Sequence, residues 1–183
     1  MNRNHESVIS IIIDNINSSA LNIDDAKSIL NVLSQFKCNF NVSVDEDGNT
    51  AFMALLLLYS LFSPSDIINL VKLNKNIDFS IKNKYQKSAS SLLIKLNNQT
   101  LIFNLINHST FDYDYKDRET GNNLLMINAI SQANVLNELL KIKGMKNRIN
   151  VVNFNNENAL IIATKGGGVV LIVLNSYLNI ISM

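Results

Sequence analysis

Cysteine and histidine are scarce in this chain of 183 residues, and their scarcity excludes several kinds of site. Cys38 is the only cysteine, so no disulfide can form within the chain, and such a composition is typical of a reducing compartment. The two histidines, His5 and His108, lack the paired spacing of a zinc site. Cys38 falls at the end of a predicted helix, where we expect it to pack as a small residue and not to act as a nucleophile.

Long runs of one charge and long apolar runs are also missing. The chain has 16 basic and 15 acidic residues, and nowhere do five like charges follow one another, so neither nucleic acid nor an anionic membrane is an indicated partner. The apolar run 169–174 is far shorter than the roughly 18 to 20 residues of a membrane span. A second run, 8–13, lies between Glu6 and Asp14 and makes a poor signal peptide. We therefore expect an intracellular, cytoplasmic protein, with the nucleus as an alternative, and no membrane span.

Two short patterns recur along the chain at nearly constant intervals. The first is an Asn or Asp followed by an apolar residue. It starts at Asn41, Asp78, Asp112 and Asn150, with intervals of 37, 34 and 38 residues. The second is a residue that can cap a helix, with apolar residues after it. It starts at Thr50, Ser88, Asn123 and Asn158, with intervals of 38, 35 and 35 residues. Two patterns that keep step at this period predict a stacked helical repeat.

The stretches between these patterns predict pairs of helices. Residues 1–37 would form an N-terminal helical cap with two helices, the first with Val8, Ile9, Ile12, Ile13 and Ile16 on one face, the second capped by Asn22 with Ile29, Leu30 and Leu33 inside. Residues 38–183 would form about four repeats, the last one atypical or truncated. Within them we expect helices over 51–59, from Ser63 onward, and over 88–95, 99–107, 124–130, 135–142, 159–164 and 169–178. The fold class is therefore all-α.

Two motifs suggest chemistry, and neither has the required spacing. Asp45-x-Asp47-x-Asn49 has the first three ligand types of a calcium loop, but Thr50 stands where the loop needs glycine. The sequence Lys165-Gly166-Gly167-Gly168 has its lysine before the glycines, whereas a phosphate loop needs it after them. We therefore expect no catalytic, cofactor-binding or metal-binding residue, and no enzyme.

The repeating unit resembles an ankyrin repeat. Asp45-Glu46-Asp47-Gly48-Asn49-Thr50-Ala51-Phe52 is similar to the opening Asp-x-x-Gly-x-Thr-Pro-Leu of that family, and residues 158–167 are similar to its first helix and closing glycine. The resemblance covers roughly residues 38–178. It departs from the family pattern because no repeat keeps the proline or the histidine, and only Thr50 keeps the threonine. It implies a short solenoid of divergent repeats with β-hairpin-like turns.

The resemblance implies a non-enzymatic protein–protein interaction module, a scaffold or adaptor that holds a protein partner against its hairpin tips and first helices. The tip residues that we expect to contact this partner are Asp45, Glu46, Asp47, Asn49, Asn83, Lys84, Tyr85, Asp117, Arg118, Glu119, Asn155, Asn156 and Glu157. The alternative is a regulatory or targeting fragment of a larger multidomain enzyme or effector. The apolar segment from Val169 to Ile181 would then continue into further sequence. A third hypothesis is an assembly protein that self-associates through this segment.

Overall fold

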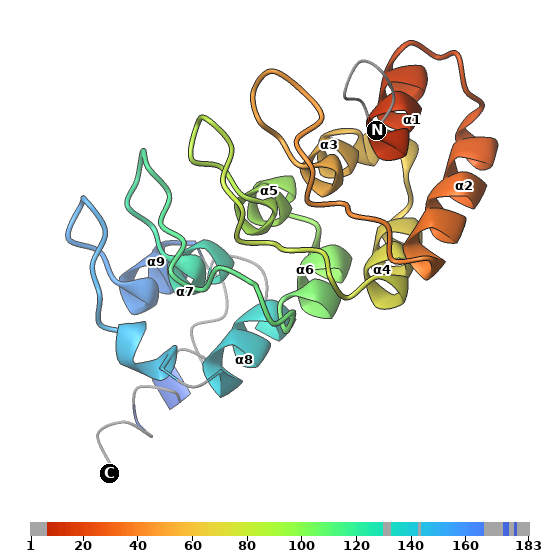
Figure 1. Cartoon of the computed structure of the whole chain (residues 1–183). Helices are drawn as coiled ribbons and strands as arrows, with labels where there is room; N and C mark the ends of the chain where they lie inside the picture. Colours follow the sequence, from red (N-terminus) through yellow and green to blue (C-terminus); the bar gives the residue numbers. More distant parts are fainter. Residues whose placement is uncertain (1–6, 130–132, 143, 167–173, 176–177, 179–183) are drawn as a thin grey trace. The chain divides into compact units, whose positions relative to one another are not determined.

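The computed structural model describes residues 7–129, 133–142, 144–166, 174–175 and 178 (Figure 1). The chain divides into two compact units, residues 1–111 and 112–183. The described residues form helices and no strand; three isolated antiparallel bridges are their only β pairings. The expectation of an all-α protein is thus confirmed. Within the described residues, no helix is both long and apolar enough to span a bilayer.

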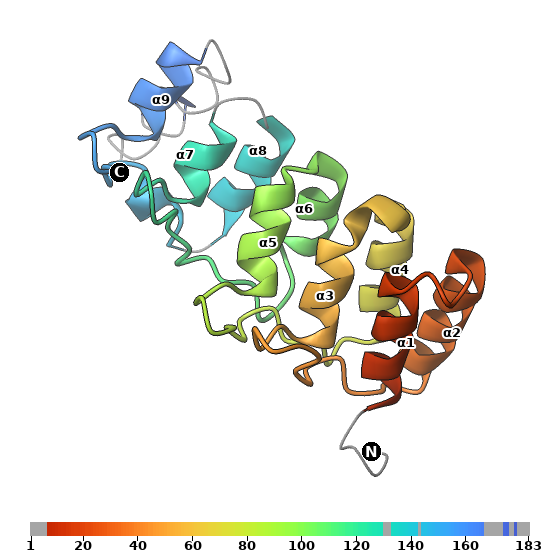
Figure 2. The ribbon, with the colours of Figure 1, turned by 90° about the horizontal axis from the view of Figure 1, so that it is seen from above.

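Unit 1 (residues 1–111) is built from two rows of helices (Figure 2). In one row α3 packs against α1 and α5, and in the other α4 packs against α2 and α6. The rows also meet, since α1 contacts α2 and α5 contacts α6. The elements of unit 1 are α1 (Val8–Asn17), α2 (Ile23–Gln35), α3 (Ala51–Leu57), the 3-10 helix η1 (Tyr59–Leu61), α4 (Pro64–Leu73), α5 (Ala89–Leu96) and α6 (Gln99–Leu105).

The second helices of these pairs start where the sequence predicts. Ser63 and Asp66 form a capping box at α4, with Pro64 in the first turn, and the expected inner face is buried. Helix α3 is shorter than expected, because it ends at Leu57 and η1 follows.

Only part of the N-terminal pair packs as expected. Ile9, Ile12, Ile13 and Ile16 of α1 are buried, whereas Val8 is 61% exposed. In α2 the buried residues follow a four-residue step: Ala26, Leu30 and Ser34. The expected inner position of Ile29 is wrong, since its side chain is 37% exposed, and Leu33 is half-buried. The reason is that α2 contacts both α1 and α4. The small side chains of Ala26 and Ser34 on its buried face let the neighbouring helices come close.

Unit 1 contains a stack of three rings that starts in its core. The rings of Phe52 and Phe79 lie 5.0 Å apart, and the imidazole of His108 lies 4.1 Å beyond Phe79, nearly parallel to it at 7°. Phe52 and Phe79 are fully buried. Such ring pairs add about 0.5–1.5 kcal/mol beyond the area that they bury.

Asparagine side chains connect the loop before one helix pair to the loop before the next. Asn41 donates from Nδ2 to the carbonyl of Asn76 (2.9 Å) and accepts from the backbone N–H of Asp78 (2.8 Å). Asn74, which is fully buried, donates from Nδ2 to the carbonyl of Cys38 (2.8 Å). Buried backbone groups need partners, and Asn41 and Asn74 supply them here, whereas the Asp78 carboxylate accepts from the backbone N–H of Ser80 (2.8 Å) in its own loop.

Hairpin-like loops precede the first helix of each later pair. Three of them are closed by the isolated bridges Ser43–Thr50, Lys82–Ser88 and Lys116–Asn123. In each predicted cap, a side-chain oxygen accepts from the backbone N–H three residues on, so all four expected N-caps are confirmed. The pairs are Thr50 with Met53 (3.2 Å), Ser88 with Ser91 (3.3 Å), Asn123 with Met126 (3.0 Å) and Asn158 with Ile161 (3.0 Å).

Unit 2 (residues 112–183) contains α7 (Leu124–Asn128), α8 (Ala133–Lys141), η2 (Lys146–Arg148) and α9 (Ala159–Lys165). Helix α7 is central, since it contacts both α8 and α9. Gly144, expected to adopt a left-handed conformation after α8, has φ +87°. The helix and the self-association segment expected at the end of the chain lie outside the described residues, apart from Leu174, Asn175 and Leu178.

Candidate functional site

The first hairpin of unit 1 (residues 41–50) has a tip that is closed by an aspartate. The carboxylate of Asp45 accepts from the backbone N–H of Asn49 (2.9 Å) and from its Nδ2 (2.7 Å). Gly48 has φ +78°, a conformation that glycine adopts without strain. Since the turn is fixed from within, the exposed side chains of Glu46 and Asp47 project from a defined backbone.

The second hairpin of unit 1 (residues 82–88) is fixed by an asparagine in the same way. The Oδ1 of Asn83 accepts from the backbone N–H groups of Tyr85 (3.0 Å) and Lys87 (2.9 Å). The neighbouring Lys84, Tyr85 and Lys87 are exposed, and the Lys87 Nζ lies 5.7 Å from the centre of the Tyr85 ring. This tip therefore presents an aromatic ring with the Lys87 cation beside it and with Lys84 preceding it in the chain.

The two hairpins of unit 1 are joined to each other. Asn83 donates from Nδ2 to Oδ1 of Asn49 (2.8 Å), the backbone N–H of Lys84 donates to the carbonyl of Asp47 (2.9 Å), and the Tyr85 hydroxyl donates to the Asp47 carboxylate (3.3 Å). Asn49 and Asn83 are each only 5% exposed. The expectation that these two side chains face a partner must be corrected: they are buried because they hold neighbouring hairpins together.

Unit 2 repeats this arrangement in the hairpins at 116–123 and 153–158. Asp117 accepts from the backbone N–H groups of Glu119 (3.2 Å) and Thr120 (2.9 Å). Asn153 accepts from those of Asn155 (2.9 Å) and Glu157 (2.9 Å), and it donates from Nδ2 to Oδ1 of Asn122 (2.8 Å). Arg118, Glu119, Asn155 and Asn156 are exposed at these tips.

Sequence reasoning missed Asn122 and Asn153, although the sequence contained a signal for them. Asp45, Asn83 and Asn153 each stand five residues before a helix cap, and Asp117 stands six before one. An Asn or Asp at this position accepts amides across the turn. The bond from one hairpin to the next needs a second asparagine 31 to 34 residues earlier, and that pairing is not visible without the fold.

Unit 2 has an open hollow of about 380 Å³ beside its last hairpin. The Lys165 ammonium donates to the Glu157 carboxylate at this hollow, and Asn153 also donates to it (3.1 Å). These two hydrogen bonds hold the pKa of Glu157 below its usual value, so its charge persists at neutral pH. The lining residues are Thr120, Asn122, Asn153, Asn155, Glu157, Ile162, Lys165 and Gly166.

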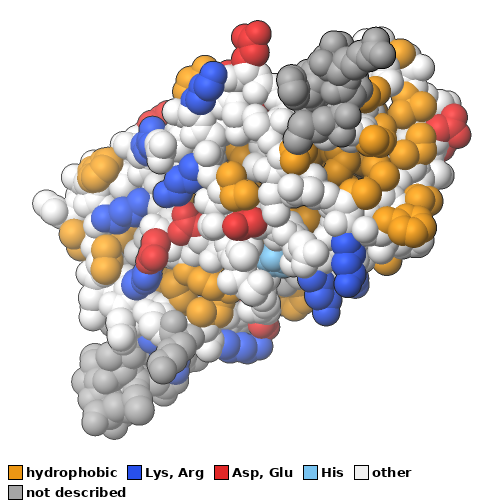
Figure 3. Space-filling view, in the orientation of Figure 1, with side chains coloured by type: hydrophobic (Ala, Val, Ile, Leu, Met, Phe, Trp, Pro, Cys, Tyr) orange, Lys and Arg blue, Asp and Glu red, His pale blue; other side chains and the backbone are white. Residues whose placement is uncertain are grey.

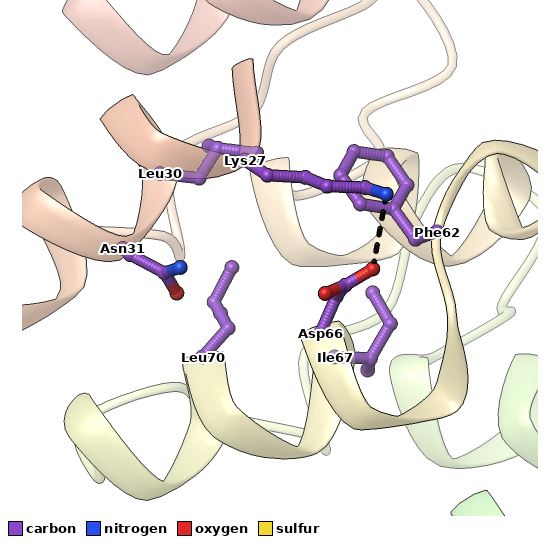
Figure 4. A pocket seen from close by; sticks show the side chains of 7 residues that line it. All are labelled: Lys27, Leu30, Asn31, Phe62, Asp66, Ile67 and Leu70. Atoms are coloured by element: carbon purple, nitrogen blue, oxygen red, sulfur yellow. Dashed lines mark ion pairs between the residues drawn. The ribbon is translucent and has the colours of Figure 1, made fainter. Parts of the chain in front are cut away.

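A second hollow, between α2 and α4 of unit 1, is too small for a ligand at about 10 Å³ (Figure 4). Lys27 extends past Phe62, and its Nζ lies 3.3 Å from the carboxylate of Asp66. Burial raises the pKa of Asp66, but the hydrogen bonds from Ser63 and Lys27 outweigh it and leave the pKa below its usual value. The geometry is that of a structural contact between two helices.

Large apolar side chains are exposed on the N-terminal pair of unit 1, where Figure 3 shows hydrophobic atoms over α1 and α2. Phe36, at the end of α2, is 78% exposed, Val8 is 61% exposed and Val32 is 49% exposed. Exposed apolar patches are typical of contact sites, but the residues singled out from the sequence lie elsewhere, on the hairpins.

The described residues contain no group of three or more His, Cys, Asp or Glu side chains that could hold a metal ion. In the calcium-like motif, both carboxylate oxygens of Asp45 accept bonds from Asn49. Cys38 is half-buried.

Comparison with known proteins yields no matching family model, no matching curated protein and no matching solved structure.

Proposed function

We propose that the chain is a non-enzymatic protein-binding module of divergent ankyrin-like repeats, acting inside the cell, whose hairpin tips contact the partner. The observation that carries the proposal is a division of roles at each tip. At each tip the side chain of one Asn or Asp accepts a backbone N–H group and so fixes the turn, while its neighbours remain exposed. A surface that is ordered before binding loses less conformational entropy when it binds.

The side chains that we propose to contact the partner are the exposed ones that do not fix a turn. In unit 1 they are Glu46, Asp47, Lys84 and Tyr85, and in unit 2 they are Arg118, Glu119, Asn155 and Asn156. Tyrosine and arginine are enriched among residues that dominate binding energies. Asp45, Asn49, Asn83, Asp117 and Glu157 have a different role in this proposal, because their side chains bond within the hairpins and hold the tips in shape.

A photo-reactive phenylalanine analogue at single positions tests this proposal in cells that produce the chain. We expect discrete cross-linked proteins from position 85 or 118, and none from position 72, an exposed residue of α4. The cross-linked protein would then be purified and its affinity measured by calorimetry. Tyr85→Ala or Arg118→Ala should weaken it by about tenfold or more, as for a residue worth at least 1.4 kcal/mol.

Cross-links confined to position 72, or an affinity that neither alanine variant changes, would exclude the tips as the binding surface.

A further inference from the structure

Opposite charges lie side by side on the two hairpins of unit 1. The first tip carries Glu46 and Asp47, the second carries Lys84 and Lys87, and all four side chains are exposed. Figure 3 shows acidic side chains over the first of these tips and basic and hydrophobic ones over the second. None of the four takes part in the ion pairs found among the described residues. Their charge is therefore available to a partner.

The offset between the two charged groups is fixed. The backbone bond from Lys84 to Asp47 and the side-chain bond from Asn83 to Asn49 set the register of the hairpins. The stem of Lys84 runs beside Gly48, since its Cγ would lie 3.8 Å from a Cβ added there. Tyr85, which is 55% exposed, lies at the boundary, bonded to Asp47 on one side and close to Lys87 on the other.

A surface with one negative and one positive half is complementary to itself. A two-fold axis between the two hairpins would place the acidic tip of each copy opposite the basic tip of the other copy, so that two equivalent contacts form. Two-fold pairs in which both copies use the same patch are the commonest form of soluble oligomer. A foreign partner would need the opposite charges at the same offset, whereas a second copy has them already.

We propose that unit 1 pairs with unit 1 of a second copy of this chain, with Glu46 and Asp47 opposite Lys84 and Lys87 and with the two Tyr85 rings near the axis. The proposal rests on the proposed function, because it names the partner of the same tips. Exposed ion pairs contribute little each, so the association is weak and is suppressed in 1 M salt, where charges are screened beyond about 3 Å.

Sedimentation of the full chain over a concentration series tests the pairing with two charge-reversed variants. One variant, Glu46→Lys with Asp47→Lys, makes both tips basic; the other, Lys84→Glu with Lys87→Glu, makes both acidic. We expect wild type to dimerise in low salt and to be monomeric in 1 M salt. Each variant alone should dimerise at least about tenfold more weakly, and a one-to-one mixture of the two should associate again, because opposite surfaces then meet.

Two controls make the result decisive. Lys72→Glu with Lys75→Glu on and beside α4 has the same change in charge as the acidic variant and should leave dimerisation unchanged. Glu46→Lys alone leaves the hydrogen bond from Tyr85 to Asp47 intact. It should therefore still weaken dimerisation even if the variant with both Glu46→Lys and Asp47→Lys is poorly folded.

A wild-type monomer at all concentrations, a dimer insensitive to salt and to these variants, or a mixture that stays monomeric would each overturn the pairing. Cross-links from position 85 to a different protein would in that case still support the proposed function.

Discussion

At the scale of single residues, buried asparagines have the largest structural role in the hairpins. Asn83 uses three hydrogen bonds, two within its own hairpin and one to Asn49 in the hairpin before it. An amide is the side chain that can both donate and accept here. The same pair recurs in unit 2 as Asn153 and Asn122. Part of the asparagine content of the chain is therefore a requirement of its fold.

Asn83→Asp tests this role, since it retains the acceptor but loses the donor. The Oδ1 of Asn49 would be left buried without this bond, at a cost of about 1–3 kcal/mol in the free energy of unfolding. Urea denaturation measures the change. Gln86→Glu, an exposed position of the same hairpin with the same change in charge, is the control. Equal stability of the two variants would contradict the role of Asn83.

Thr50 is the second residue with a specific prediction. Its hydroxyl accepts from the N–H of Met53 at the start of α3, and its side chain is buried. Thr50→Ala should cost about 1 kcal/mol of unfolding free energy, whereas Thr50→Ser keeps the oxygen and should cost less. A urea midpoint that the alanine variant leaves unchanged would show that the cap contributes nothing.

His108 makes the stability of unit 1 depend on pH. Burial lowers its pKa below the usual 6.5, and the charge of Asp78 opposes this only in part. The folded state thus favours the neutral ring. This stability is present above pH 6.5 and is lost as the pH falls from there towards the lower pKa of the folded state.

We expect the urea midpoint of wild type to decrease when the pH is lowered from 7.5 to 5.5. The decrease should be smaller in His108→Gln. The carboxylates with lowered pKa, Asp66 and Glu157, titrate below this window. Parallel pH profiles for the two proteins would exclude His108 as the cause.

At the scale of elements, the hairpins differ in how tightly their glycines are enclosed. Gly48 and Gly121 both have positive φ, +78° and +73°. A Cβ at Gly48 would meet no atom closer than 3.7 Å, whereas a Cβ at Gly121 would lie 2.8 Å from the Phe154 ring. The ring therefore covers the third hairpin, whose Thr120 carbonyl also accepts from the N–H of Phe154 (3.1 Å).

Gly48→Ala should cost about 1–2 kcal/mol of unfolding free energy through backbone strain alone. Gly121→Ala should cost more, because the ring must also move. Phe154→Ala removes the ring that a Cβ at position 121 would meet. Gly121→Ala should therefore cost less unfolding free energy in the Phe154→Ala background than in wild type, which a double-mutant cycle in urea measures. Additive costs would show that the ring does not restrict this position.

At the scale of the whole molecule, the two units have unequal cores. The buried phenylalanines of the described residues, Phe40, Phe52, Phe62, Phe79 and Phe111, all belong to unit 1. The described part of unit 2 buries aliphatic and methionine side chains and no phenylalanine, for example Leu124 to Met126 in α7 and Val135 and Leu139 in α8. Since burial of apolar area is the main source of stability, we expect unit 1 to be the more stable.

The fragment 1–111 should accordingly retain its helical circular dichroism and unfold cooperatively in urea, at a higher midpoint than the fragment 112–183. The full chain, measured under the same conditions, is the reference. A fragment 1–111 that is unfolded by itself would show that its core depends on the rest of the chain.

The sequence by itself determined the all-α class, the helix pairs and the four caps at Thr50, Ser88, Asn123 and Asn158. These features depend on bonds between residues three apart and on apolar spacing along one helix, and both can be read locally. Tertiary structure decided the inward positions of Asn49 and Asn83 and the packing face of α2 at Ala26 and Leu30. Each of these depends on a neighbour some 30 to 40 residues away in the chain, and a pattern read along one segment does not contain that neighbour.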